Sequence, residues 1–237
     1  RVFGLENWKI LTCLWVIVPV INGIAFFKVP MAPLIKDGEK GMSVSSLFKN
    51  KTFWILMLMM LCAGASEQAV SQWASVFAEK GLGVSKTLGD LAGPMTFAIL
   101  MGSARVFYGK FGDRINLDKF MLGSSILCIA SYLCISLAPS PFLSLVGCAI
   151  AGLSVGIMWP GSFSKASASI KNGGTALFAM LALAGDLGCA SGPALVGYVS
   201  SITSDNLKNG ILVAIIFPVL LVFGILLTKS KKMKVKV

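Results

Sequence analysis

Apolar residues are gathered into seven long runs along the chain, and polar residues are concentrated in the segments between those runs. A helix of about 20 residues crosses the hydrocarbon core of a bilayer, and each run is close to that length or longer. The pattern therefore predicts an all-α membrane protein with seven transmembrane helices, at residues 10–27, 53–77, 90–107, 120–138, 142–163, 175–199 and 210–227.

The composition favours this class over a water-soluble one. Hydrophobic residues make up 56% of the chain and charged residues 13%, whereas soluble domains carry about 25% charged residues. The net charge of +11 does not indicate nucleic-acid binding, because no polar segment is long enough to form a domain for it. We expect the lipid bilayer, and no nucleic acid, as a partner.

The distribution of Lys and Arg predicts the topology. Fifteen of them lie in segments 28–52, 108–119, 164–174 and after residue 228, which fall on one side of the membrane, and five lie on the other side. Positively charged loops stay in the cytoplasm. We therefore expect a multi-pass protein of the cell membrane, with segment 28–52 and the C-terminal tail in the cytoplasm. A short interfacial helix is expected around Val44–Phe48.

The second predicted helix has a polar face, made of Gly64, Glu67, Gln68, Ser71, Gln72 and Ser75. An acidic residue at the centre of a membrane helix costs about 3 kcal/mol on insertion scales, so this face should meet a polar cavity or another helix. We interpret Glu67 as a proton or substrate site, and Gln68, Ser71 and Gln72 as polar groups lining the same cavity for a hydroxylated solute. The alternative is a polar stripe that joins two helices.

A second acid, Asp186, lies in the sixth predicted helix at a depth similar to that of Glu67, so the two could share a proton or a cation. Arg105 lies nearer the cytoplasmic end of the third predicted helix. Its depth differs from that of Glu67 by about 14 Å, so we expect no direct pair between them. Trp159 is interpreted as an interfacial aromatic residue.

Small residues of the sixth predicted helix allow a close approach of neighbouring helices, and its proline is expected to kink it. These packing and hinge residues are Gly188, Gly192, Pro193 and Gly197. The chain has no His, and its six Cys lie in apolar runs. We therefore expect no metal site, no cofactor and no catalytic residues.

The segment GKFGDRINLDK, after the third predicted helix, resembles the cytoplasmic loop signature of the major facilitator superfamily. Gly109, Asp113 and Arg114 match the signature and form a candidate cytoplasmic gate motif. Asn116 stands where the second Gly is usual, and Asn also tolerates the left-handed backbone. Asp118 stands where a basic residue is usual. The long linker at residues 28–52 precedes this segment, and the Gly-Pro motif of the sixth predicted helix follows it. The family has these features in the same order.

The resemblance implies the C-terminal half of such a transporter. Residues 1–27 would be the last helix of the N-terminal half, 28–52 the linker, 53–228 the C-terminal six helices and 229–237 a basic tail. The first five helices would be missing. Two halves would rock about a site near the midplane. Asp113 would brace the start of the sixth predicted helix, near residues 173–175. The Glu and Trp of the second predicted helix are similar to those of fucose–hexose proton symporters.

We expect secondary, proton-coupled transport of a small polar solute such as a sugar. Three alternatives stand beside it. The first is efflux of drugs or metabolites, whose cavities are more apolar. The second is a membrane enzyme, which the absence of His disfavours. The third is a truncated fragment that does not transport by itself.

Overall fold

The computed structural model describes residues 8–30, 41–82 and 85–228. The chain divides into two compact units, residues 1–38 and residues 39–237. Within the first unit, α1 (Trp8–Lys28) is an apolar helix with Pro19 inside it.

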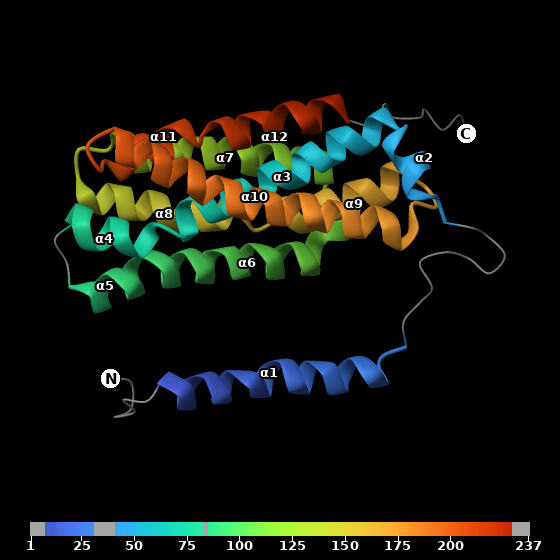
Figure 1. Cartoon of the computed structure of the whole chain (residues 1–237), viewed down its shortest axis with the longest axis horizontal. Helices are drawn as coiled ribbons and strands as arrows, with labels where there is room; N and C mark the ends of the chain where they lie inside the picture. The colour runs from blue at the N-terminus through green and yellow to red at the C-terminus, as the bar shows by residue number, and fades with distance from the viewer. Residues whose placement is uncertain (1–7, 31–40, 83–84, 229–237) are drawn as a thin grey trace. The chain divides into compact units, whose positions relative to one another are not determined.

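The second unit is made of helices (Figure 1). In chain order they are α2 (Val44–Phe48), α3 (Lys51–Ser71), α4 (Ala74–Leu82), α5 (Lys86–Asp90), the π-helical turn η1 (Leu91–Met95), α6 (Thr96–Phe111), the 3₁₀ turn η2 (Gly112–Arg114), α7 (Leu117–Leu137), α8 (Pro141–Val155), α9 (Met158–Ser169), α10 (Gly174–Ile202), α11 (Leu207–Val213) and α12 (Ile216–Leu227). The described residues contain no strand, and the all-α prediction is confirmed. The short helix expected at Val44–Phe48 is present as α2.

Five helical segments of the described chain are long and apolar enough to cross a membrane: Lys51–Glu79, Leu117–Leu137, Pro141–Ser169, Gly174–Ile202 and Leu207–Leu227. They correspond to five of the seven predicted helices. The first predicted helix contains a shorter apolar helix, Thr12–Lys28. The third is helical from Lys86 to Phe111 and so extends beyond both predicted ends, and it includes charged residues such as Arg105 and Lys110.

Three of the predicted continuous helices are interrupted, which corrects the sequence prediction. The interruptions fall between α3 and α4, between α8 and α9, and between α11 and α12. Proline explains the last two, because it has no N–H to donate to the carbonyl four residues earlier. Pro160 leaves the carbonyl of Gly156 without its helical donor. Pro218 cannot donate to the carbonyl of Ala214, which accepts from the N–H of Phe217 at 3.1 Å instead. Both carbonyls lie where the helix breaks.

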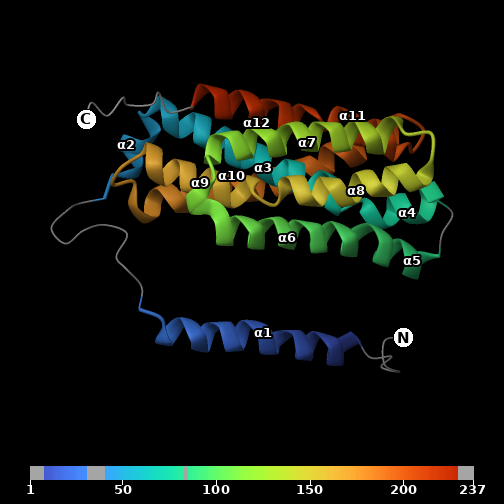
Figure 2. The same ribbon diagram turned by 180° about the vertical axis from the view of Figure 1, so that it is seen from behind.

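The helix α3 lies at the centre of the second unit and packs on α8, α9, α10 and α12 (Figures 1 and 2). Its closest neighbour is α10. A Cβ atom at Gly188 would lie 2.8 Å from the carbonyl carbon of Leu61, and one at Gly192 would lie 2.6 Å from the carbonyl oxygen of Ala65. Lipid tails are as apolar as the side chains, so close packing of small residues is what holds membrane helices together.

The glycine contacts of α10 can be tested with a matched pair of substitutions. Gly188→Ala forces α3 and α10 apart, and overpacking of this kind costs roughly 1–3 kcal/mol. A Cβ at Gly123 of α7 meets nothing within 4 Å, so Gly123→Ala should stabilise the helix by roughly 0.5–1 kcal/mol. Thermal unfolding of the purified protein in detergent measures both changes. Melting temperatures that move in the same direction would contradict the assigned packing.

Candidate functional site

Glu67 of α3 and Arg105 of α6 form an ion pair within the membrane-spanning part of the second unit. The Nη2 atom of Arg105 lies 3.1 Å from Oε2 of Glu67, and the side chains are 43% and 14% exposed. The sequence prediction of no direct pair is therefore wrong. α6 continues to Phe111, four residues past the predicted end, which places Arg105 about 6 Å deeper than the prediction assumed. Both side chains are also long.

The break between α8 and α9 holds Arg105 in place. Pro160 cannot donate to the carbonyl of Gly156, and the Nε atom of Arg105 donates to that oxygen instead, at 3.3 Å. The guanidinium of Arg105 thus donates both to the carbonyl of Gly156, which lacks its helical donor, and to the carboxylate of Glu67. The hydrocarbon core of a membrane has no water to form hydrogen bonds with such groups. The two contacts supply partners within the protein and so explain why these charges are tolerated there.

Trp159, next to Pro160, belongs to the same site. Its ring packs on Gly185 of α10, where a Cβ atom would lie 2.5 Å from Cη2 of the indole. The ring also lies 6.2 Å from that of Phe163, centroid to centroid. The buried Nε1 atom has no hydrogen-bond partner among the described residues. The interfacial interpretation of Trp159 therefore missed its place beside the ion pair. The proline after it was the signal, since it marks a break in an apolar helix.

These side chains line a pocket of about 430 Å³, made by Glu67, Arg105, Trp159, Pro160 and Phe163. Small-molecule sites in proteins have volumes of about 300–1,000 Å³. One wall offers a carboxylate that accepts hydrogen bonds and a guanidinium that donates them. The other wall is aromatic. The pocket therefore suits a small solute with a polar edge and an apolar face.

The other predicted cavity residues lie outside the lining of this pocket. Gln68 and Ser71 are half-buried on α3, and Gln72 is exposed in the break that follows it. Asp186 is exposed on α10, next to the Gly185 that carries the Trp159 ring. The predicted polar face does not run along one helix, because α3 ends at Ser71. Gly64, at its start, packs against Gly185 and Cys189 instead.

The packing residues of α10 lie along its contact with the α3–α4 region. Gly188 and Gly192 face α3, and Gly197 faces Trp73, where a Cβ atom would lie 2.8 Å from Cζ2 of the indole. The Nε1 atom of Trp73 donates to the carbonyl oxygen of Pro193 at 3.1 Å. Pro193 lies inside an unbroken helix, Gly174–Ile202.

The loop between α6 and α7 carries the signature-like residues on its surface. Gly109, Asp113 and Arg114 are exposed. Within the described residues Asp113 makes no hydrogen bond or ion pair, and the brace expected near residues 173–175 is not formed in this structure. Asn116 has φ −71° and accepts from the backbone N–H of Lys119 at 3.0 Å. It caps α7, so the expectation that it replaces a left-handed glycine is wrong.

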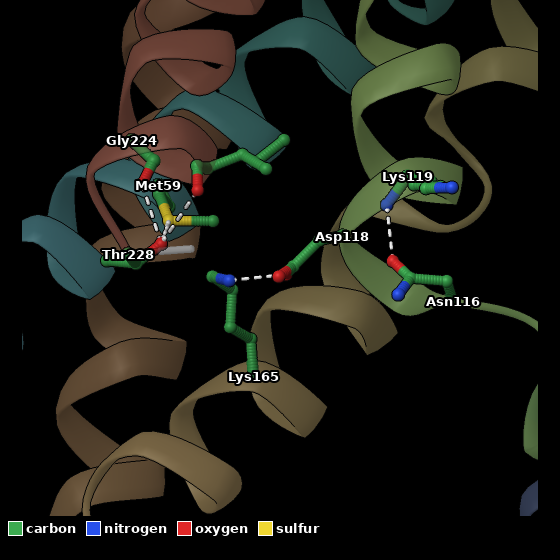
Figure 3. Close-up of polar contacts among 8 residues, drawn as sticks. Met59, Asn116, Asp118, Lys119, Lys165, Gly224 and Thr228 are labelled. Atoms are coloured by element: carbon green, nitrogen blue, oxygen red, sulfur yellow. Dashed lines mark hydrogen bonds and ion pairs between the residues drawn. The ribbon is translucent and has the colours of Figure 1, made fainter. Parts of the chain in front are cut away.

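Asp118 has a partner that the sequence comparison did not anticipate. Nζ of Lys165, on α9, lies 2.5 Å from its carboxylate, and the side chains are 5% and 22% exposed (Figure 3). A buried ammonium needs a paired charge. The acidic residue at this position therefore neutralises a lysine of the neighbouring helix and ties α7 to α9.

In a comparison with protein families, the model of the Major Facilitator Superfamily matches residues 2–193. The chain belongs to this superfamily. It is a multi-pass protein of a family of membrane transporters, and the resemblance seen in the loop after α6 is confirmed. Comparisons with curated proteins and with solved structures give no match.

The ion pair of Lys165 and Asp118 makes a prediction about stability. Asp118→Asn leaves a buried ammonium unpaired and should destabilise the protein by roughly 3 kcal/mol. Lys165→Met combined with Asp118→Asn should recover most of that loss, because no buried charge remains. Thermal unfolding of the four proteins of this cycle measures the coupling. If Asp118→Asn lowers the stability equally in the wild type and in Lys165→Met, the ion pair contributes nothing to stability.

Proposed function

We propose that this transporter carries a small polar solute, such as a sugar, together with protons. Transport would occur by alternating access. The observation that supports this most is the pocket in which the ion pair of Glu67 and Arg105 faces Trp159. The pair is neutral as a whole, so the pocket is suited to a neutral solute. A sugar has hydroxyl groups for both charged partners and an apolar face for the indole.

The same pair offers a way to couple transport to protons. A proton on Glu67 removes the negative charge and breaks its ion pair with Arg105, whose Nε keeps the carbonyl of Gly156 as a partner. The guanidinium then has donors free for a solute hydroxyl. Glu67 thus links protonation to solute binding in this proposal, and Asp186 is the second candidate carrier. Gln68, Ser71 and Gln72 would meet the solute only in another conformation.

The order of the elements supports a place for this chain in the C-terminal half of the twelve-helix architecture. We propose that the other half of the transporter closes the cavity. One end of the second unit carries α2, η2 and the α9–α10 connection, and we call it the α2 end. We propose that this end faces the cytoplasm and that Gly109, Asp113 and Arg114 contact the other half there. Exposed Lys and Arg residues of the described chain are more frequent at this end, as the topology rule requires.

Efflux of an apolar drug or metabolite is the second candidate. Three of the five residues that line the pocket are Trp159, Pro160 and Phe163, and this apolar share favours it. The charges of Glu67 and Arg105 favour the polar solute, because an apolar ligand that covered them would leave both without water.

The proposal predicts the behaviour of Glu67→Gln in the complete transporter, reconstituted in proteoliposomes. Uptake of a labelled sugar driven by a pH gradient should be abolished, because Gln cannot exchange a proton. Counterflow exchange, which needs no net proton movement, should persist. Glu79→Gln is the matched control, because Glu79 is an exposed Glu on α4, and it should leave both activities unchanged.

Gradient-driven uptake that is unchanged in Glu67→Gln would contradict the role of Glu67 and move it to Asp186. A wild-type protein that takes up no sugar, but exports apolar dyes, would favour the efflux candidate instead.

A further inference from the structure

A second pocket of about 430 Å³ lies between α6 and α7, away from the ion pair. The two helices are joined by η2 and each packs on α8. Near η2 they meet through aromatic side chains: the Phe120 ring lies 6.1 Å from that of Tyr108 and 6.2 Å from that of Phe107. The two helices form the walls of a groove whose floor is α8. Ala104 and Phe107 line one wall, Phe120, Ser124 and Leu127 the other, and Leu153 lies at the floor.

The groove is shaped for a hydrocarbon chain. Phe120 and Leu127 are seven residues apart on α7, so the groove runs for at least about 10 Å along the helix from near its first turn. Its lining is apolar and open to the outside: Phe107 on α6 is 47% exposed and Leu127 on α7 is 37% exposed. Acyl chains of one leaflet run in the same direction, over about half of the 30 Å hydrocarbon core.

Cationic side chains lie on the connection between the two walls of the groove, at the α2 end. Lys110 of α6, Arg114 of η2 and Lys119 of α7 are all exposed. Nζ of Lys110 lies 5.6 Å from the centroid of the Phe111 ring, which lies 5.1 Å from that of Phe107 in the groove wall. Lys119 directly precedes Phe120 of the other wall, and Figure 3 shows its side chain pointing away from the ion pair of Asp118 and Lys165.

The acidic residues of this loop do not cancel that charge. Asp118 is neutralised by Lys165, and Asp113 is exposed. Three cations therefore stand against one carboxylate that has no cationic partner. This charge favours anionic over zwitterionic lipids in the apolar groove, because three cations attract an anionic headgroup more strongly than a zwitterionic one.

We propose that the groove binds one anionic phospholipid of the leaflet on the α2 side. An acyl chain lies between α6 and α7 over Leu153, and the headgroup phosphate lies between Lys110 and Lys119. The lipid fills the space that α6 and α7 leave over α8. The site is separate from the pocket of Glu67 and Arg105 and does not depend on what that pocket transports.

Native mass spectrometry of the purified chain, released from detergent, tests this. Titration with palmitoyl-oleoyl-phosphatidylglycerol should give one tightly bound lipid, and palmitoyl-oleoyl-phosphatidylcholine should bind more weakly. Lys110→Gln combined with Lys119→Gln should weaken phosphatidylglycerol binding roughly tenfold or more and leave phosphatidylcholine binding unchanged. Lys49→Gln combined with Lys171→Gln is the matched control, because it removes two exposed charges from the same end outside the groove.

A second pair of variants tests the groove itself. Ser124→Phe fills the space between the walls and should abolish the bound lipid. Gly123→Phe adds the same ring one residue away, where a Cβ atom meets nothing within 4 Å, and should retain it. Equal binding of the two lipids, equal losses from the two lysine pairs, or lipid retained by Ser124→Phe would each overturn the proposal.

Discussion

The site depends on one constraint, which is that a carboxylate deep in a membrane must have a partner. Glu67 satisfies it with Arg105 at 3.1 Å, and Arg105 in turn needs its own position fixed. Pro160 supplies that position by freeing the carbonyl of Gly156, to which Arg105 donates. The helices α3 and α6 and the break between α8 and α9 are therefore joined by polar contacts that the bilayer makes obligatory. The aromatic wall follows, because Trp159 directly precedes the same proline.

The close contact of α3 with α10 bears on the pocket through Trp159, whose ring packs on Gly185 of α10. Helices in lipid gain little from burying apolar area against one another, so their contacts rely on small residues that let backbones approach. Gly188 and Gly192 bring α10 against α3, and Gly185 of the same stripe leaves room for the Trp159 ring. The packing of α10 and the position of the Trp159 ring are thus coupled. A residue that widened the contact of α3 with α10 would also move the indole relative to Glu67.

The sequence predicted the helices well, because about 20 apolar residues in lipid have few structures other than a helix. It also predicted that Glu67 needs a polar partner, but not which one. Arg105 was excluded because the end of its helix was placed at residue 107, and helix ends are the least reliable part of such a prediction. The helix breaks at Gly156 and Ala214 could have been predicted, since Pro160 and Pro218 each lie four residues further on. The pairing of Asp118 with Lys165 could not have been predicted. It joins residues 47 positions apart, in helices whose rotation about their axes no local sequence pattern fixes.

The most direct test of this account is an exchange of the two charges. Thermal stability and the yield of folded monomer in detergent would be measured for the wild type, for Glu67→Arg, and for Glu67→Arg combined with Arg105→Glu. The account predicts that the single reversal destabilises the protein by roughly 3 kcal/mol, because it places two like charges together in the membrane. The exchange should recover part of that loss, because the charges are paired again although Glu at position 105 cannot donate to the carbonyl of Gly156. If the exchanged protein is no more stable than the single variant, Glu67 and Arg105 are not partners, and the pocket is not built on their ion pair.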